Sequence, residues 1–288
     1  MATRKRRPPP RRPCCSAWRN EGAAPAPPQA RGISRYAYTA SGHPSTLPDR
    51  RTMTRTNEHG QPIGDALSDW TPRARPPATA MQGRFCRVEP LDAARHAADL
   101  YQAHHQARDD SLWTYLNYGP FQDAGTFNDY VAQAAASTDP MHHAIIDLAS
   151  GKAIGTAALM RIDPANGVIE IGHVCYSPLL QRTPIATEAQ YLFMRRVFDE
   201  LGYRRLEWKC DSLNEPSRKA AARYGYTFEG VFRQAIVYKG RTRDSAWFSI
   251  IDGEWPALRQ AYEAWLAPQN FDADGRQRQS LRACIGRD

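Results

Sequence analysis

The side chains best suited to acid–base chemistry lie in one segment, residues 169–189. Glu170 and His173 alternate there with apolar residues, which predicts a strand, and Thr187 begins an apolar pattern with helical spacing. The N–H groups at a helix start have no intrahelical acceptor and lie at the positive end of the helix dipole. A strand, a turn and a helix start in this order can therefore cradle a pyrophosphate beside two candidate bases.

Hydrophobic periodicity predicts the elements that must position this segment. The order of elements combines an antiparallel meander with one strand–helix–strand crossover, and such a crossover implies two parallel strands. We expect strands at 85–89, 143–148, 154–162, 167–176 and 206–210, a hairpin of 230–238 with 246–251, and helices at 92–104, 124–136, 187–201, 216–224 and 256–266.

Charge and proline divide the 288 residues into four parts. Residues 1–52 carry eleven Lys and Arg against two acidic residues, and nine prolines, so we expect a disordered basic extension, with Met53 as an alternative native start. We expect an extended proline-rich arm at 53–82, the folded domain at 83–268, and a loose polar tail at 269–288. The remaining 27 basic and 28 acidic residues leave the rest nearly neutral. Nucleic-acid binding is therefore expected only through residues 1–52.

Several classes of protein are not expected. No stretch of about 18 apolar residues is present, which argues against a membrane-spanning helix, and the first 20 residues lack the apolar core of a secretory signal. The six cysteines form no CxxC pair, which argues against a zinc module and a disulfide framework. We therefore expect a cytoplasmic protein without a metal, either a monomer or a homodimer.

Four local features carry a resemblance to a known family. They are the strand end Tyr176-Ser177-Pro178 with the loop Gln181-Arg182-Thr183-Pro184-Ile185-Ala186, the helix start Thr187-Glu188-Ala189, the pair Asn214-Glu215-Pro216-Ser217 and Gly225-Tyr226-Thr227-Phe228-Glu229-Gly230, and the hairpin end 243–249 followed by Glu254-Trp255. In this order and spacing, residues 83–266 resemble the GNAT superfamily of N-acetyltransferases, and most closely its RimJ/RimL-like branch. The resemblance implies an α+β fold of α/β/α layers, with a mixed central sheet whose parallel strands splay apart.

The resemblance also implies a function. It is the transfer of an acetyl group from acetyl-CoA to a primary amine, on a protein N-terminus or a small molecule, by direct attack in a ternary complex. One departure stands out, because the family has Gly where this chain has Pro184. Proline lacks an N–H, so one donor to a phosphate is lost, and Arg182 is the residue that we expect to compensate. The alternative is a GNAT-fold binding or regulatory module that has lost catalysis.

The implied site divides into three groups of residues. For the base we favour Glu170, with His173 as its rival, although Glu170 is also explained as a strand residue paired to a basic neighbour. For the acid we favour Ser217, with Tyr224 as the alternative. The residues expected to contact the coenzyme are Val174, Cys175, Tyr176, Gln181, Arg182, Thr183, Ile185, Ala186, Thr187, Asn214 and Ser217. The aromatic residues Trp113, Tyr115, Tyr118 and Phe121 are expected to wall the acceptor site or, alternatively, to form a hydrophobic cluster under a loop.

Overall fold

The computed structural model describes residues 55–286, which divide into two units at Ala66. In the first unit, β1 (Arg55–Thr56) pairs antiparallel with β2 (Pro62–Ile63). The prediction of an extended arm without secondary structure is therefore wrong at this small hairpin. The basic extension 1–52 and the alternative start Met53 lie outside the described residues.

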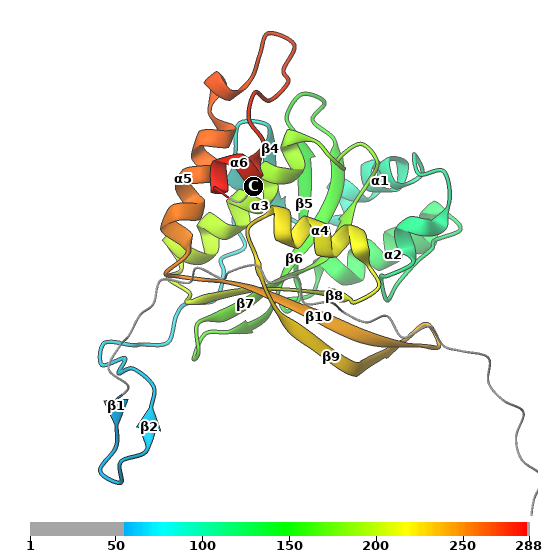
Figure 1. The fold of residues 1–288 in the computed structure, drawn as a ribbon. Helices are drawn as coiled ribbons and strands as arrows, with labels where there is room; N and C mark the ends of the chain where they lie inside the picture. Colours follow the sequence, from blue (N-terminus) through cyan, green and yellow to red (C-terminus); the bar gives the residue numbers. More distant parts are fainter. Residues whose placement is uncertain (1–54, 287–288) are drawn as a thin grey trace, which may run out of the picture. The chain divides into compact units, whose positions relative to one another are not determined.

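The second unit is built on one mixed sheet of eight strands (Figure 1). Only β7 and β8 pair in parallel, and every other neighbouring pair is antiparallel. This arrangement confirms the predicted meander and crossover. In spatial order the strands are β3 (Met81–Gln82), β4 (Cys86–Pro90), β5 (Met141–Asp147), β6 (Ala153–Asp163), β7 (Val168–Tyr176), β8 (Arg205–Asp211), β10 (Arg241–Ile251) and β9 (Thr227–Tyr238).

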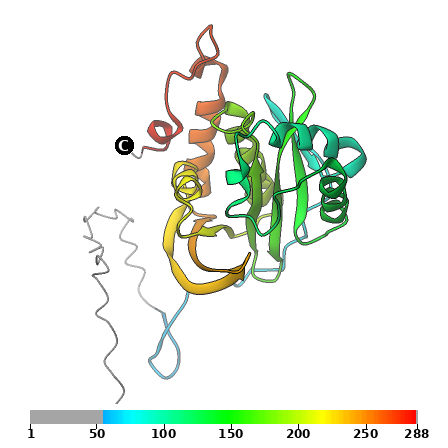
Figure 2. The ribbon, with the colours of Figure 1, turned by 90° about the vertical axis from the view of Figure 1, so that its right-hand side faces the viewer.

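Helices lie on both faces of the sheet, as Figure 2 shows. One face carries α1 (Ala93–His104) and α2 (Ala124–Ala135), and the other carries α3 (Pro184–Arg195), α4 (Glu215–Arg223) and α5 (Trp255–Leu266). Two hydrophobic clusters fill the two interfaces. The α+β fold in α/β/α layers is thereby confirmed. No helix among residues 55–286 is long and apolar enough to cross a bilayer.

Helix α3 begins three residues earlier than predicted. Thr183 is its N-cap, because the Thr183 hydroxyl accepts a hydrogen bond from the N–H of Ala186 at 3.3 Å. Pro184 occupies the first helical position, where its fixed φ fits the helix and an N–H would have no intrahelical acceptor. The last turn widens into a π-helix over Arg196–Glu200.

Two segments outside the predicted elements lie against the domain. In the arm, the Trp70 indole donates to the carbonyl of Ala165 at 2.9 Å, and the Tyr203 hydroxyl donates to the carbonyl of Ala74 at 3.1 Å. After α5, the chain forms a short helix α6 (Leu281–Ile285), whose Leu281 is only 1% exposed in the core. Asn270 is also buried and donates to the carbonyl of Trp265 at 2.8 Å. Residues 269–286 are therefore not a loose tail, because buried side chains anchor them.

The parallel strands separate soon after they begin. β7 and β8 are paired at Val168 with Arg205, Ile169 with Leu206, and Glu170 with Glu207. Beyond Glu170, β7 continues to Tyr176 and β8 continues to Asp211 without pairing to each other. The divergence leaves the facing edges of both strands open at the end of β7 that leads into α3.

Candidate active site

Glu170 lies at the last paired position before β7 and β8 diverge, and it is buried. Its Oε2 lies 3.0 Å from Lys209 Nζ and 3.2 Å from Arg161 Nε. Burial raises the pKa of this carboxyl, and the charges of Lys209 and Arg161 oppose that rise. Glu170 is thus a strand residue paired to basic neighbours, which was one of the two interpretations of it. Its place at the divergence of the strands is also compatible with the other interpretation, a general base.

Lys209 and its surroundings were missed by the sequence reasoning. Its Nζ also lies 2.6 Å from Glu207 Oε2 and 3.7 Å from the centre of the Trp247 ring. Lys209 stands between the buried residues Trp208 and Cys210. The signal that could have found it is the alternation of the charged residues Arg205, Glu207 and Lys209 with apolar ones along β8, because charged side chains need partners when they are buried.

His173 lies in a different environment. Its backbone is left-handed, with φ of 48°, at a register shift between β6 and β7. Its ring stacks on Tyr118 at 5.7 Å and meets His142 edge-on at 4.9 Å. Burial lowers the pKa of His173, so the imidazole is a weaker base than an exposed one.

The end of β7 points its side chains to opposite sides. Cys175 Sγ lies 3.5 Å from His104 Nε2, beside α1. The Tyr176 hydroxyl instead accepts a hydrogen bond of 2.7 Å from the Gln190 amide of α3. Contacts of Val174, Cys175 and Tyr176 with a coenzyme can therefore come from their backbone, and this remains a prediction.

The loop between β7 and α3 is folded upon itself. The Gln181 amide donates to the carbonyl of Tyr176 at 2.7 Å, and the Thr183 hydroxyl donates to the carbonyl of Leu180 at 2.7 Å. Arg182 has a left-handed backbone, with φ of 62°, and is exposed. This geometry leaves the Arg182 guanidinium accessible to an anion at the start of α3.

The first turns of α3 combine buried residues with a nearby cation. Ile185 is half-buried, whereas Ala186 and Thr187 are buried. The Thr187 hydroxyl accepts a hydrogen bond of 3.0 Å from Arg223, a residue of α4 that is itself exposed. The sequence reasoning did not select Arg223, and it adds a second positive charge near this helix start.

The start of α4 is capped as its sequence predicts. The Asn214 side chain accepts from the N–H of Ser217 at 3.1 Å. The Ser217 hydroxyl accepts from the Trp208 indole at 3.0 Å and also interacts with the Cys210 side chain. At the other end of α4, Tyr224 is buried, and burial raises its pKa. The structure thus brings both candidate acids to one helix beside β8.

Tyr226, which sequence reasoning passed over, lies in the same region. Its hydroxyl is buried without a hydrogen-bond partner. Burial raises its pKa, and the nearby carboxylate of Glu170 raises it further. A signal was present in the sequence, because a second tyrosine follows Tyr224 across a single glycine.

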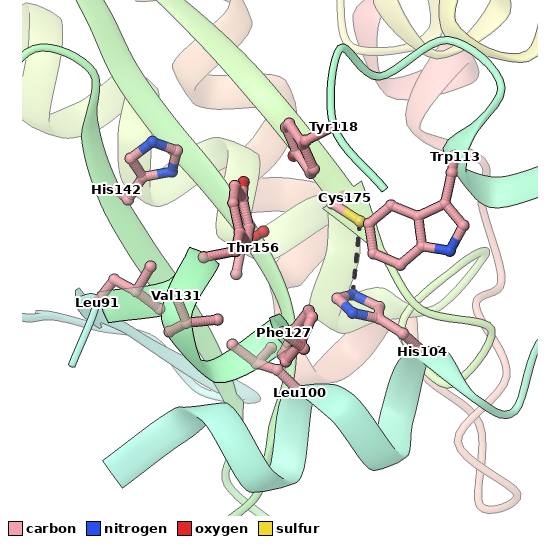
Figure 3. A pocket seen from close by; sticks show the side chains of 11 residues that line it. Leu91, Leu100, His104, Trp113, Tyr118, Phe127, Val131, His142, Thr156 and Cys175 are labelled. Atoms are coloured by element: carbon pink, nitrogen blue, oxygen red, sulfur yellow. Dashed lines mark hydrogen bonds between the residues drawn. The ribbon is translucent and has the colours of Figure 1, made fainter. Parts of the chain in front are cut away.

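Three of the four predicted acceptor-wall residues form a hydrophobic cluster. Trp113, Tyr118 and Phe121 pack with Phe127 and Tyr130 under the loop between α1 and α2. Figure 3 shows a cavity that Trp113 and Tyr118, but not Phe121, help to line. Its other lining residues include His104, His142 and Thr156. The cavity measures about 10 Å³, the size needed for one water molecule.

Tyr115 and the hairpin tip close the loop from outside. The Tyr115 hydroxyl donates to the carbonyl of Leu213 at 3.1 Å. Lys239 Nζ donates to the carbonyls of Trp113 at 2.8 Å and Tyr118 at 3.0 Å. The loop between α1 and α2 is therefore tied to the β8–α4 loop and to the β9–β10 hairpin.

A buried glutamate at the divergence of two parallel strands, on the strand that leads into a helix start with nearby arginines, matches the resemblance drawn from the motifs. The profile of the family described as "Acetyltransferase (GNAT) domain" matches residues 87–227. A crystal structure of a GCN5-related N-acetyltransferase from Brucella melitensis is 52% identical, with a TM-score of 0.74, and the match covers 76% of this chain and 100% of that one. The chain belongs to the GNAT family of acetyltransferases.

Two further comparisons agree with this assignment. A probable GNAT acetyltransferase from Chromobacterium violaceum is 43% identical over 68% of this chain and 98% of its own, with a TM-score of 0.64. An uncharacterized N-acetyltransferase, p20, from Bacillus licheniformis is 27% identical over 51% of this chain and 84% of its own. The predicted GNAT fold is confirmed, and membership of the family implies acetyl transfer to an amine. Among residues 55–286, no group of three or more His, Cys, Asp or Glu side chains is arranged to hold a metal ion.

Proposed function

We propose that this GNAT protein transfers an acetyl group from acetyl-CoA to a primary amine by direct attack in a ternary complex. The observation that carries the proposal is the separation of β7 and β8 immediately after the Glu170–Glu207 pair. It leaves unpaired backbone groups on the facing edges of both strands. Unpaired N–H groups of Val174 or Cys175 are the donors that we assign to the tetrahedral oxyanion.

The residues around the α3 start fit an anionic coenzyme. Arg182 and Arg223 are exposed there, and the first helical turn presents N–H groups at the positive end of the helix dipole. We assign coenzyme binding to the loop residues Gln181, Arg182 and Thr183, to Ile185, Ala186 and Thr187 of α3, and to Asn214. Bound acetyl-CoA would supply the activated acetyl thioester.

Proton transfer is assigned to residues on the two sides of the divergence. Glu170 takes the proton that the attacking amine must lose, since only a neutral amine is nucleophilic. Ser217 gives a proton to the departing thiolate, and the hydrogen bond that its hydroxyl accepts from Trp208 orients it. Tyr224, at the end of the same helix, is the alternative donor.

For the acceptor we propose a protein N-terminus or a small primary amine, in keeping with a RimJ/RimL-like enzyme. Tyr115 is the aromatic residue best placed to contact an acceptor. Its hydroxyl bonds the β8–α4 loop at Leu213, whereas Trp113, Tyr118 and Phe121 belong to the hydrophobic cluster. This assignment separates one wall residue from three packing residues.

A second function is favoured by one observation, Pro184. It removes a donor from the first turn of α3 at the place where a phosphate is expected. The loss of one hydrogen bond to a charged group corresponds to about 1.5–3 kcal/mol if nothing replaces it. Such a loss would leave a GNAT-fold module that binds a ligand without catalysis.

Calorimetric titration of the full chain with acetyl-CoA and with desulfo-CoA tests the proposal. We expect micromolar binding of both, followed by turnover with at least one member of an amine panel that includes peptides. Arg182→Ala is expected to weaken acetyl-CoA binding about tenfold, as expected for one charge-assisted hydrogen bond. Binding without turnover would favour the binding module, and no binding at all would overturn the enzyme assignment.

A further inference from the structure

No step of the proposed reaction uses Lys209. We propose that Lys209 is a positioning residue that holds the Glu170 carboxylate ionised and fixed at the point where β7 and β8 separate. The inference rests on the proposed function, because it concerns the residue assigned as the base. It assigns no proton transfer to Lys209, which stays an ammonium throughout.

The contacts of Lys209 fix its charge in one place. Its side chain is only 7% exposed, and Nζ lies between Glu170 at 3.0 Å and Glu207 at 2.6 Å. The ring of Trp247 covers the ammonium at 3.7 Å, which adds a cation–π attraction. A flexible lysine on a surface would lose this geometry to side-chain entropy, whereas a buried and doubly paired one keeps it.

A row of alternating charges continues on either side. Arg205 bonds Glu207 at 2.8 Å and also bonds Glu229 of β9 at 2.7 Å. At the other end, Arg161 of β6 approaches Glu170 at 3.2 Å. The residues of this row come from β6, β7, β8 and β9, and every carboxylate in it has a cation on at least one side.

The two cations next to Glu170 are not equivalent. The Arg161 side chain is 57% exposed, so water and salt screen its charge. Lys209 is buried, so its field acts on the carboxylate with little screening. The other groups that face Glu170 are Glu207, which opposes its ionisation, and the neutral hydroxyl of Tyr226. Lys209 is therefore the main group that offsets the burial of Glu170.

This geometry has a consequence for amine transfer. A protonated Glu170 cannot accept the proton of the attacking amine, and burial alone pushes the carboxyl toward that protonated form. Lys209 keeps the carboxylate available at neutral pH, while burial keeps its basicity above that of an exposed glutamate. Burial and the ion pair with Lys209 together make Glu170 a stronger base than an exposed glutamate and keep it ionised at neutral pH.

The test compares the pH dependence of kcat/KM in four proteins. Lys209→Met is expected to move the acid limb upward by about 1–3 pH units, the effect of losing an opposite charge within 4–6 Å. Lys209→Arg keeps the charge and is expected to return the limb toward wild type. Arg161→Met, the matched control at the exposed cation, is expected to move it by less than about half a unit.

Glu207→Gln provides a test in the opposite direction. It removes the competing carboxylate and is expected to lower the acid limb, because Lys209 then pairs with Glu170 alone. The titration of a ¹³C-labelled Glu170 carboxyl, followed by NMR, reports the same shifts without any turnover.

Two results distinguish a failure of the inference from a failure of the proposed function. If Glu170→Gln abolishes turnover but neither Lys209→Met nor Glu207→Gln moves the acid limb or the carboxyl titration, Lys209 does not position the base. If Glu170→Gln turns over at the wild-type rate, Glu170 is not the base and the inference falls with that assignment. If Lys209→Met does not fold, Glu207→Gln and the carboxyl titration decide the matter alone.

Discussion

Two regions that bury titratable side chains differ in how they treat charge, one at the divergence of β7 and β8 and one around the cavity between the sheet and helices α1 and α2. In the first region, Glu170 and Lys209 lie within ion-pair distance at 3.0 Å. In the second region, none of the described residues that line the cavity forms an ion pair. Burial lowers the pKa of His104 to about 4 and raises that of Cys175 to about 12. The comparison shows that burial with a partner preserves charge, whereas burial without one enforces neutrality.

This difference separates the two candidate bases. His173 belongs to the aromatic region, where its ring lies against Tyr118 and His142. Its lowered pKa makes the neutral imidazole a poor proton acceptor near pH 7. Glu170 belongs to the charged region, and its raised pKa lies in the direction that a general base needs. The geometry therefore favours Glu170.

The largest expected effect comes from removing each base in turn. Glu170→Gln is expected to lower kcat by about 10²–10⁴-fold, the usual contribution of a positioned general base, with little change in acetyl-CoA affinity. His173→Asn is expected to lower kcat by less than about tenfold, through packing alone. Steady-state kinetics with one amine acceptor measure both.

A reversed ranking of the two variants would break the comparison. A large loss in His173→Asn together with near-normal turnover in Glu170→Gln would place the base in the aromatic region. Circular dichroism of each variant controls for loss of structure.

The second prediction concerns acid stability, which the aromatic region should limit. His104 is buried in the folded protein with a pKa near 4, against about 6.5 in an unfolded chain. Its depressed pKa contributes stability that is present above pH 6.5 and is lost as pH falls toward 4. The loss approaches about 1.4 kcal/mol per pH unit for this one residue.

Urea unfolding at pH 7.5, 6.0 and 5.0 measures this loss. His104→Gln keeps a polar group beside Cys175 and cannot titrate in this range. Its free energy of unfolding is therefore expected to fall less steeply with acid than that of the wild type. Equal slopes in the two proteins would show that His104 does not carry the acid sensitivity.

Much of the fold was predictable because its signals are local. Apolar periodicity placed α1 and α2, and in the structure their N-caps are Asp92 and Asp123, whose side chains accept from N–H groups of the first turn. The turn between β7 and α3 carried the motif from which the family was inferred. The start of α3 was predicted too late, because Pro184 was taken as part of the loop when it is the first residue of the helix.

The partners of the site residues were not predictable, because sheet register decides them. Lys209 and Arg161 meet Glu170 from β8 and β6, and nothing near Glu170 in the sequence indicates either contact. Glu188 is a similar case, since its carboxylate accepts from the N–H groups of Arg84, Phe85 and Cys86, about a hundred residues away. Spacing identifies a candidate residue, and only the assembled sheet identifies its environment.

The smallest expected effect concerns Tyr226, a tyrosine near Glu170. Tyr226 carries a buried hydroxyl without a hydrogen-bond partner, and such a group costs stability because it has lost water. Tyr226→Phe is therefore expected to raise the free energy of unfolding by up to about 1 kcal/mol.

Tyr176→Phe is the matched control. Its hydroxyl accepts from Gln190 at 2.7 Å, so its removal is expected to cost about 1 kcal/mol. Urea unfolding measures both variants, and a Tyr226→Phe variant less stable than wild type would show that this hydroxyl is satisfied in solution.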